Sequence, residues 1–467
     1  MNDLLDDRPV ASLARQWSTE ITVELSNLSR RSFLSLTAGT SAAAALAACG
    51  SSGPGTGGGG GTSKDAATFW FLTGQPQEGI RANAVAEFNK ANPDNKIVEQ
   101  RFQNDAFKTK IKAAIGAGQG PTLIWGWGGG GLKSYVEAGQ VEDLTDWMSQ
   151  NQAIKDKLFP SSFPAATVNG KLYALPIETV QPIILYWNKK VFDSAGVQPP
   201  KSWGDIMNLV GVFNSKGIAP FSLGGQSRWT NMMWLEFLYD RIGGPEVFEA
   251  IYNGEKDAWN HPASIEALTK VQDLVKAKGF IKGFSSITAD SNADQALLYK
   301  GRAAMMLHGG WTYGGMKKDG GDFVKKGELG WMNFPPVENG KGDPSDTVGN
   351  PGQYLSISSK ASAAQKETAK KFLASGKFTD GEIKGWIDSG AVPIVKGTES
   401  LISASPDKEF LSFVYDTSSK AKFFGQSWDQ ALSPQAAEVL LTNISKLFQL
   451  SVTPQQFATN MNAVLGK

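Results

Sequence analysis

The fold is decided by residues 67–125, which read ATFWFLTGQPQEGIRANAVAEFNKANPDNKIVEQRFQNDAFKTKIKAAIGAGQGPTLIW. Short apolar runs at 67–72, 96–102 and 121–125 have the length and the β-forming residues of buried strands. The segments between them repeat apolar residues at helical spacing: Ile80, Ala84, Val85 and Phe88, then Phe107, Ile111 and Ile115. Strands that alternate with helices in this way predict right-handed βαβ units and a parallel sheet.

In open sheets of this kind, ligands bind beyond the carboxyl ends of the strands. Here those ends are 73–75, 103–105 and 126–127, which offer hydroxyl, amide and carboxylate groups and one indole, but no pair of nucleophile and base. Alternatively, Trp127 anchors a loop on the core and Asp105 only caps a helix. We predict ligand contacts at the three strand ends, from Thr73, Gln75, Asn104 and Trp127.

The later part of the chain is richer in helix. Apolar stripes at helical spacing and strand-like runs alternate along it, the stripes at 206–213, 233–238, 265–275 and 439–448 and the runs at 183–187, 303–307 and 354–357. We find no internal repeat of fixed period, which argues against a solenoid or a propeller. The sequence therefore predicts an α/β protein with two lobes.

Composition excludes several classes of function. The 467 residues include 46 Lys and Arg against 45 Asp and Glu, a net charge of +1, which argues against nucleic acid as a partner. One Cys excludes a disulfide framework and a Cys-ligated zinc site, and two His leave little room for a multi-His metal centre. We predict no metal and no cofactor. The 14 Trp residues are the unusual feature of the composition.

The first 48 residues have the features of an export signal. Arg30 and Arg31 precede an Ala-rich apolar run that is too short to span a membrane, and this run ends in Leu-Ala-Ala before Cys49. The paired arginines resemble a twin-arginine signal, and the residues before Cys49 resemble a lipobox. We predict a signal peptide at 1–48, lipidation of Cys49 and a flexible Gly/Ser-rich tether at 49–64. The alternative is a buried structural Cys after a chance Ala run.

A family resemblance is carried by the order of six segments: TFWFLTGQ (68–75), FNKANPD (88–94), AAIGAGQGPTLIWGW (113–127), GKLYALPIETVQPIILYWNKKVF (170–192), GRAAMMLHGGW (301–311) and DSGAVPI (388–394). Together they resemble the extracellular solute-binding proteins of ATP-binding-cassette importers. Among these they look like the carbohydrate-binding cluster that includes maltose- and xylo-oligosaccharide-binding proteins. The resemblance spans nearly the whole chain after Cys49.

The resemblance implies a two-lobed solute-binding-protein fold, with the ligand in a cleft between lobes that close by a hinge. It also implies a monomer, a membrane permease as partner and a place at the outer face of the cell membrane. The chain would cross between the lobes near 176–179, 348–351 and 389–393. The implied lobes are an N-terminal lobe of 65–177 and 350–390 and a C-terminal lobe of 178–349 and 391–467.

Sugars present hydroxyls and an apolar C–H face, so their sites combine aromatic platforms with polar side chains. Trp311 follows a strand and two glycines, and the resemblance places it in the cleft, together with Trp428 and Asp429. Three further candidates are Glu178, at the first implied crossing, and Arg228 and Trp229, before a helical stripe. The alternatives are core packing for an indole, a hinge salt bridge for Glu178 and a neighbouring ion pair for Arg228.

One motif is rejected. Gly126, Gly128 and Gly131 satisfy the dinucleotide pattern G-x-G-x-x-G after a predicted strand. That pattern belongs to the first βαβ unit and needs an acidic residue at the end of the next strand, whereas this is the third strand and Glu142 lies too near.

Three hypotheses for function remain. The first is a binding module that captures an oligosaccharide, xylobiose or a similar short chain, by hinge closure and delivers it to the permease. The second is a surface-anchored glycan-active enzyme, which needs two carboxylates about 5–10 Å apart and has no motif in its favour. The third is a binding protein for a non-sugar solute, for which Arg228 alone is thin evidence. The Trp residues near predicted loops favour a sugar.

Overall fold

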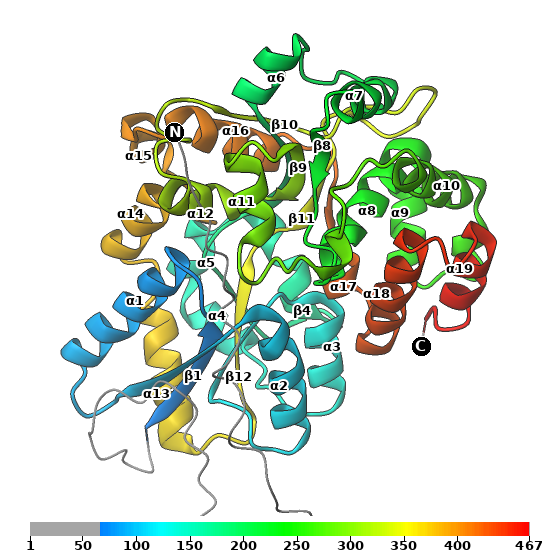
Figure 1. Cartoon of the computed structure of the whole chain (residues 1–467). Coiled ribbons are helices and arrows are strands. Elements are labelled where there is room, and N and C mark those ends of the chain that lie inside the picture. Colours follow the sequence, from blue (N-terminus) through cyan, green and yellow to red (C-terminus); the bar gives the residue numbers. More distant parts are fainter. Residues whose placement is uncertain (1–65, 467) are drawn as a thin grey trace, which may run out of the picture. The chain divides into compact units, whose positions relative to one another are not determined.

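The computed structural model describes residues 66–466 (Figure 1). The signal peptide, Cys49 and the tether that the sequence predicts lie outside the described residues. Within them, the strands form two larger sheets and one small ribbon of β4 (Thr167–Val168) and β5 (Lys171–Leu172). No helix among them is both long and apolar enough to cross a membrane.

The first sheet has five strands in the order β2-β1-β3-β12-β6. Its strands are β1 (Ala67–Leu72), β2 (Ile97–Phe102), β3 (Leu123–Gly126), β6 (Leu175–Ile177) and β12 (Gln353–Ile357). β1 pairs in parallel with both β2 and β3, which confirms the predicted βαβ units, whereas β12 pairs antiparallel with β3 and β6.

Helices cover both faces of this sheet (Figure 1). Phe69 of β1 lies 6.1 Å from Phe372 of α13 (Ala363–Ser375), which also contacts Phe88 of α1 (Gln77–Ala91). The next residue, Trp70, points to the other face, where Lys110 of α2 (Asn104–Gly116) lies over its ring. The apolar stripes in the sequence therefore mark the faces that the helices bury.

The second sheet has six strands, with β13-β11-β7-β9-β8 in order and β10 paired to β7. Its strands are β7 (Gln181–Asn188), β8 (Ala219–Ser222), β9 (Ala303–Gly309), β10 (Leu329–Met332), β11 (Thr347–Asn350) and β13 (Phe424–Gln426). A second core packs on it, and the predicted stripes at 206–213, 233–238, 265–275 and 439–448 supply many of its buried residues.

The remaining helices pack around the two sheets. They are α3 (Gly129–Glu137), α4 (Thr145–Gln150), α5 (Gln152–Lys157), α6 (Lys189–Ala195), α7 (Trp203–Ser215), α8 (Trp229–Gly243), α9 (Pro245–Tyr252), α10 (Pro262–Lys276), α11 (Ala293–Tyr299), α12 (Thr312–Asp319), α14 (Asp380–Asp388), α15 (Glu399–Ala404), α16 (Lys408–Ser419), α17 (Trp428–Ala431), α18 (Pro434–Phe448) and α19 (Pro454–Asn462). We call the part built on the first sheet the N-terminal lobe and the part built on the second sheet the C-terminal lobe.

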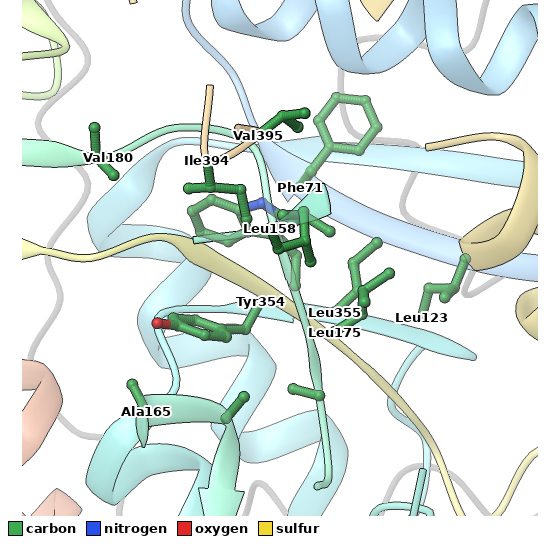
Figure 2. Close-up of a cluster of buried hydrophobic side chains, with 14 of the residues drawn as sticks. Phe71, Leu123, Leu158, Ala165, Leu175, Val180, Tyr354, Leu355, Ile394 and Val395 are labelled. Atoms are coloured by element: carbon green, nitrogen blue, oxygen red, sulfur yellow. The ribbon is translucent and has the colours of Figure 1, made fainter. Parts of the chain in front are cut away.

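The chain passes from the first sheet to the second between β6 and β7, and returns between β11 and β12. A third segment, 392–395, lies beside the first passage, since the Val180 N–H donates to Val392 O (3.0 Å) and the Ile394 N–H to Glu178 O (2.9 Å). Figure 2 shows Ile394 and Val395 of this segment in the same apolar cluster as Leu158. The connections between the lobes are thus hydrogen-bonded to one another.

Candidate functional site

A cavity of about 190 Å³ lies where the two lobes meet. The N-terminal lobe contributes the segments that follow β1, β2 and β3, and the C-terminal lobe contributes the start of α8, the end of β9 and the segment 289–295, which includes the start of α11. This is the edge of the first sheet that strand polarity predicts for a ligand. Of the ten predicted contact residues, seven line the cavity: Thr73, Gln75, Asn104, Trp127, Trp229, Trp311 and Asp429.

The wall from the C-terminal lobe is aromatic. The rings of Trp229 and Trp311 lie 6.0 Å apart, and both stand at 5.4 Å from the ring of His308. Gly309 makes this cluster possible, because a Cβ there would lie 1.9 Å from the Trp311 ring. His308 Nε2 lies 3.2 Å from Asp294 Oδ2, and both side chains are buried, so this histidine serves the structure of the wall.

Several buried polar atoms of the cavity residues form no hydrogen bond within the described part of the chain. They include Trp229 Nε1, Asp290 Oδ1, Gln295 Oε1 and Asn350 Oδ1. Buried polar groups in proteins are nearly always paired, and leaving one unpaired costs about 1–3 kcal/mol. Donors and acceptors beside indole rings form a site that can hold a neutral, hydroxyl-rich ligand.

Charged contacts join the two lobes around this cavity. Lys108 Nζ of α2 lies 2.9 Å from Asp429 Oδ2 and stands over the rings of Trp127 (4.9 Å) and Trp229 (6.0 Å). The backbone N–H of Asp105 donates to Asp290 Oδ2 at 3.0 Å. The N-cap position of α2 is Gln103, so Asp105 is not the helix cap that the sequence suggested as an alternative.

For Glu178, the structure corrects the prediction of ligand contact. Its carboxylate is buried and accepts from Arg81 at 2.9 and 2.7 Å and from Trp125 Nε1 at 3.0 Å. Burial alone would raise the pKa of Glu178, but the Arg81 guanidinium and these hydrogen bonds outweigh burial and leave the pKa lowered. The carboxylate is saturated by protein donors, as in the alternative of a hinge salt bridge.

Trp428 and Arg228 also lie elsewhere than predicted. Trp428 is fully buried in the C-terminal core, where its ring lies 4.5 Å from Phe248 and 5.1 Å from Tyr239. Arg228 does not line the first cavity; it forms an ion pair with Glu438 at 2.8 Å beside a second cavity. The amphipathic character of an indole and the charge of an arginine fit either place, so the residue types alone misled the prediction.

Some residues of the cavity carry no signal in the sequence. Gln77, Arg81 and Gln295 lie on helices, and Asp290 lies in an irregular loop, so neither strand ends nor aromatic clusters mark them. Gln77 Nε2 donates to Trp311 O at 3.2 Å, which links α1 to the wall of the other lobe. Gln77 differs from the other three in lying soon after the end of β1, so the strand end could have pointed to it.

The first cavity offers few groups that could catalyse a reaction. Asp290 and Asp429 are the carboxylates among the lining residues, and each already accepts hydrogen bonds from the protein. Among residues 66–466, no group of three or more His, Cys, Asp or Glu is placed to hold a metal ion. The glycines of the rejected nucleotide motif serve backbone packing instead, since a Cβ on Gly128 would lie 2.4 Å from Ala165 O.

Comparison with known proteins agrees with this two-lobed architecture. The family of bacterial extracellular solute-binding proteins matches residues 73–375, well over half of the chain. A solved structure from a study of xylan utilization by the thermophilic bacterium Caldanaerobius polysaccharolyticus is 31% identical, with a TM-score of 0.77 over 86% of this chain and 100% of that one. A chitin oligosaccharide binding protein superposes with a TM-score of 0.76 over 86% and 98% of the two chains, at 24% identity.

An uncharacterized ABC transporter extracellular-binding protein of Pyrococcus horikoshii is 27% identical over 54% of this chain and 56% of its own length. The chain thus spans about half the length of the curated relatives it matches. The family match and the fold define a solute-binding protein and not an enzyme. The chain belongs to the bacterial extracellular solute-binding protein family.

Proposed function

We propose that this protein captures an oligosaccharide between its two lobes and delivers it to the permease of an ATP-binding-cassette importer. The observation that carries the proposal is the cavity between the lobes, with indole rings of Trp229 and Trp311 beside buried, unpaired hydrogen-bonding atoms. Indole faces stack on the C–H faces of sugars, and unpaired donors and acceptors match hydroxyl groups.

The proposed ligand is xylobiose or a similar short oligosaccharide. It is supported by the likeness to the protein from the xylan study, and a likeness in fold to a chitin oligosaccharide binding protein is consistent with it. A charged solute such as an amino acid is disfavoured, because Lys108 is paired with Asp429 and Arg81 with Glu178. These pairs leave no unpaired Lys or Arg among the described lining residues for the carboxylate of such a solute.

Export completes the proposal. The signal peptide at 1–48 directs the chain out of the cell, and lipidation of Cys49 holds it, as a monomer, at the outer face of the membrane. Replacement of Cys49 by Ser should release the protein into the medium, and replacement of Arg30 and Arg31 by Lys should block export. Undiminished export of the second variant would remove the twin-arginine assignment.

A thermal-shift screen tests the ligand. The chain without residues 1–49 is heated with mono- and oligosaccharides of different linkage, and a sugar at a hundred times its dissociation constant should add about 2.7 kcal/mol of stability. A shift with one sugar series, without hydrolysis products after overnight incubation, supports the proposal. Cooperative melting with no shift for any sugar would remove the carbohydrate assignment.

A further inference from the structure

A second cavity, of about 660 Å³, lies beside the first one. Its walls come from α2, α3 and β3 of the N-terminal lobe and from α17, α18 and the segment 226–229 of the C-terminal lobe. The function proposed above makes no use of this space. Because both lobes line the second cavity, its shape depends on closure just as that of the first does.

The interior of the second cavity is apolar. Buried side chains form much of its wall: Phe107, Ile111, Ile124, Leu132, Tyr354 and Leu432. Tyr135 adds a hydroxyl that forms no hydrogen bond within the described residues, and burial raises the pKa of this hydroxyl to about 12. An apolar pocket with few polar groups is typical of a small-molecule site.

The charged residues around the second cavity are paired or exposed. Arg228 is paired with Glu438 at 2.8 Å and Lys108 with Asp429 at 2.9 Å, while Asp105 and Lys112 are exposed. No unpaired charge points to an ionic ligand, since a buried charge needs a partner. The second cavity therefore suits a neutral and largely apolar group.

The two cavities share a wall. Six residues line both of them: Lys108, Trp125, Trp127, Trp229, Asp429 and Gln430. The Lys108 ammonium stands over the indoles of Trp127 and Trp229, one from each lobe. Lys108 is partly exposed and has a flexible four-carbon stem, so it can swing out of this wall. A ligand that enters the first cavity thus has a path to the second.

We propose that the second cavity binds an apolar aglycone joined to the sugar that occupies the first cavity. The ligand class is then a neutral glycoside with an aryl or alkyl substituent. When it binds, the Lys108 ammonium moves off the two indoles, and Asp429 keeps the hydrogen bond from Gln430 Nε2 (2.7 Å). This inference rests on the proposed function, because the sugar anchors the substituent. Tyr135 offers a hydroxyl that hydrogen-bonds a polar atom on the aglycone.

The test compares methyl and 4-nitrophenyl glycosides of the same sugar by isothermal titration calorimetry, using xylobiosides, chitobiosides and maltosides. Ala113→Phe places a ring in the second cavity, since Ala113 is exposed on α2 and lines only that cavity. Ala106→Phe is the matched control, because Ala106 is exposed on the same helix and lines neither cavity. Thermal melts verify that both variants fold.

In the wild type and in Ala106→Phe, the 4-nitrophenyl glycoside should bind about tenfold more tightly than the methyl glycoside, about 1.4 kcal/mol. Ala113→Phe should lose this gain and keep the affinity for the methyl glycoside. Equal affinities in the wild type, or a gain that survives Ala113→Phe, would overturn the inference and leave the proposed function intact. A gain from added sugar residues alone would overturn it too, by placing glycan in the second cavity. If no glycoside binds, the proposed function fails as well.

Discussion

Two different sets of contacts join the lobes. At the hinge edge, the backbone segments around 178–180 and 392–394 are hydrogen-bonded to each other, and Arg81 and Glu178 form a buried ion pair. Around α17, the lobes meet through backbone atoms that approach Gly129 and Gly130, and through the partly exposed pair of Lys108 and Asp429; we call these the α17 contacts.

This difference separates contacts that persist when the lobes move from contacts that can open. Contacts at the hinge edge lie in or beside the covalent connections, so they persist whether the lobes are apart or together. The α17 contacts join residues about 300 positions apart, such as Gln426 Nε2 and Trp127 O at 2.8 Å. We expect changes at the hinge edge to alter stability and changes at the α17 contacts to alter ligand affinity.

The largest effect should come from Arg81→Met, which leaves the Glu178 carboxylate buried without its cation. Breaking one side of a buried ion pair costs about 3–5 kcal/mol. The measurement is the free energy of unfolding in urea. Arg101→Met is the control, because Arg101 pairs with Glu78 at 2.7 Å on a more exposed surface and should cost less than about 1 kcal/mol. Equal losses in the two variants would contradict a special role for the hinge pair.

The pH dependence of the hinge pair has a definite sign. Because the pKa of Glu178 is lowered in the folded state, its contribution to stability is present above the unfolded pKa and is lost as pH falls through the folded pKa. Arg81→Met combined with Glu178→Gln removes both charges, so it should recover most of the stability and this acid dependence should vanish. A double variant no more stable than Arg81→Met would contradict the account.

Gly130→Ala should break the α17 contacts. A Cβ on Gly130 would lie 2.1 Å from Leu432 O of the other lobe, and opening of the lobes relieves this clash. Overpacking costs about 1–3 kcal/mol, so the affinity for the sugar found in the thermal screen should fall about 5- to 150-fold. Gly131→Ala is the matched control, since nothing lies within 4 Å of its Cβ position. Equal affinities of the two variants by calorimetry would mean that closure does not bring these surfaces together.

A smaller effect is expected from Gln426→Leu, which removes the hydrogen bond to Trp127 O. One such bond contributes about 0.5–1.5 kcal/mol, so the dissociation constant should rise a few-fold. Gln449→Leu removes a bond from the C-cap residue of α18 to Ser445 within that helix and should leave affinity unchanged. A larger loss of stability than of affinity in Gln426→Leu would place this contact with the hinge edge.

The smallest effect should be a pH slope. Burial raises the pKa of Asp290, which accepts from the Asp105 N–H across the cleft. If closure buries this carboxylate, closure takes up protons, and affinity should rise modestly as pH falls from about 7 toward the raised pKa. Asp290→Asn should remove that slope. The same slope in the variant would assign it to another group.

Much of the fold could be predicted because its signals are local. The apolar runs that became β1, β2 and β3 are bounded by polar and turn residues, and strand polarity alone placed Trp127 at the cavity. Element positions of this kind follow from periodicity within ten or twenty residues.

The predictions that were wrong concern residues whose surroundings are formed by distant parts of the chain. Trp428 and Trp229 look alike in the sequence, but Trp428 is buried by Tyr239 and Phe248, far away in the chain. Glu178 forms an ion pair with Arg81, which lies 97 residues earlier. No local pattern encodes such partners, so the role of a polar or aromatic residue is set by tertiary contacts that the sequence does not display.

The central claim is that a neutral sugar is held between the lobes in the first cavity. A crystal structure of the complex with the sugar that gives the largest thermal shift tests it most directly. The account predicts a sugar that stacks on Trp229 or Trp311 and hydrogen-bonds to Thr73, Gln75 or Asn104, so that it contacts both lobes at once. A sugar bound to one lobe only, or outside this cavity, would contradict the account.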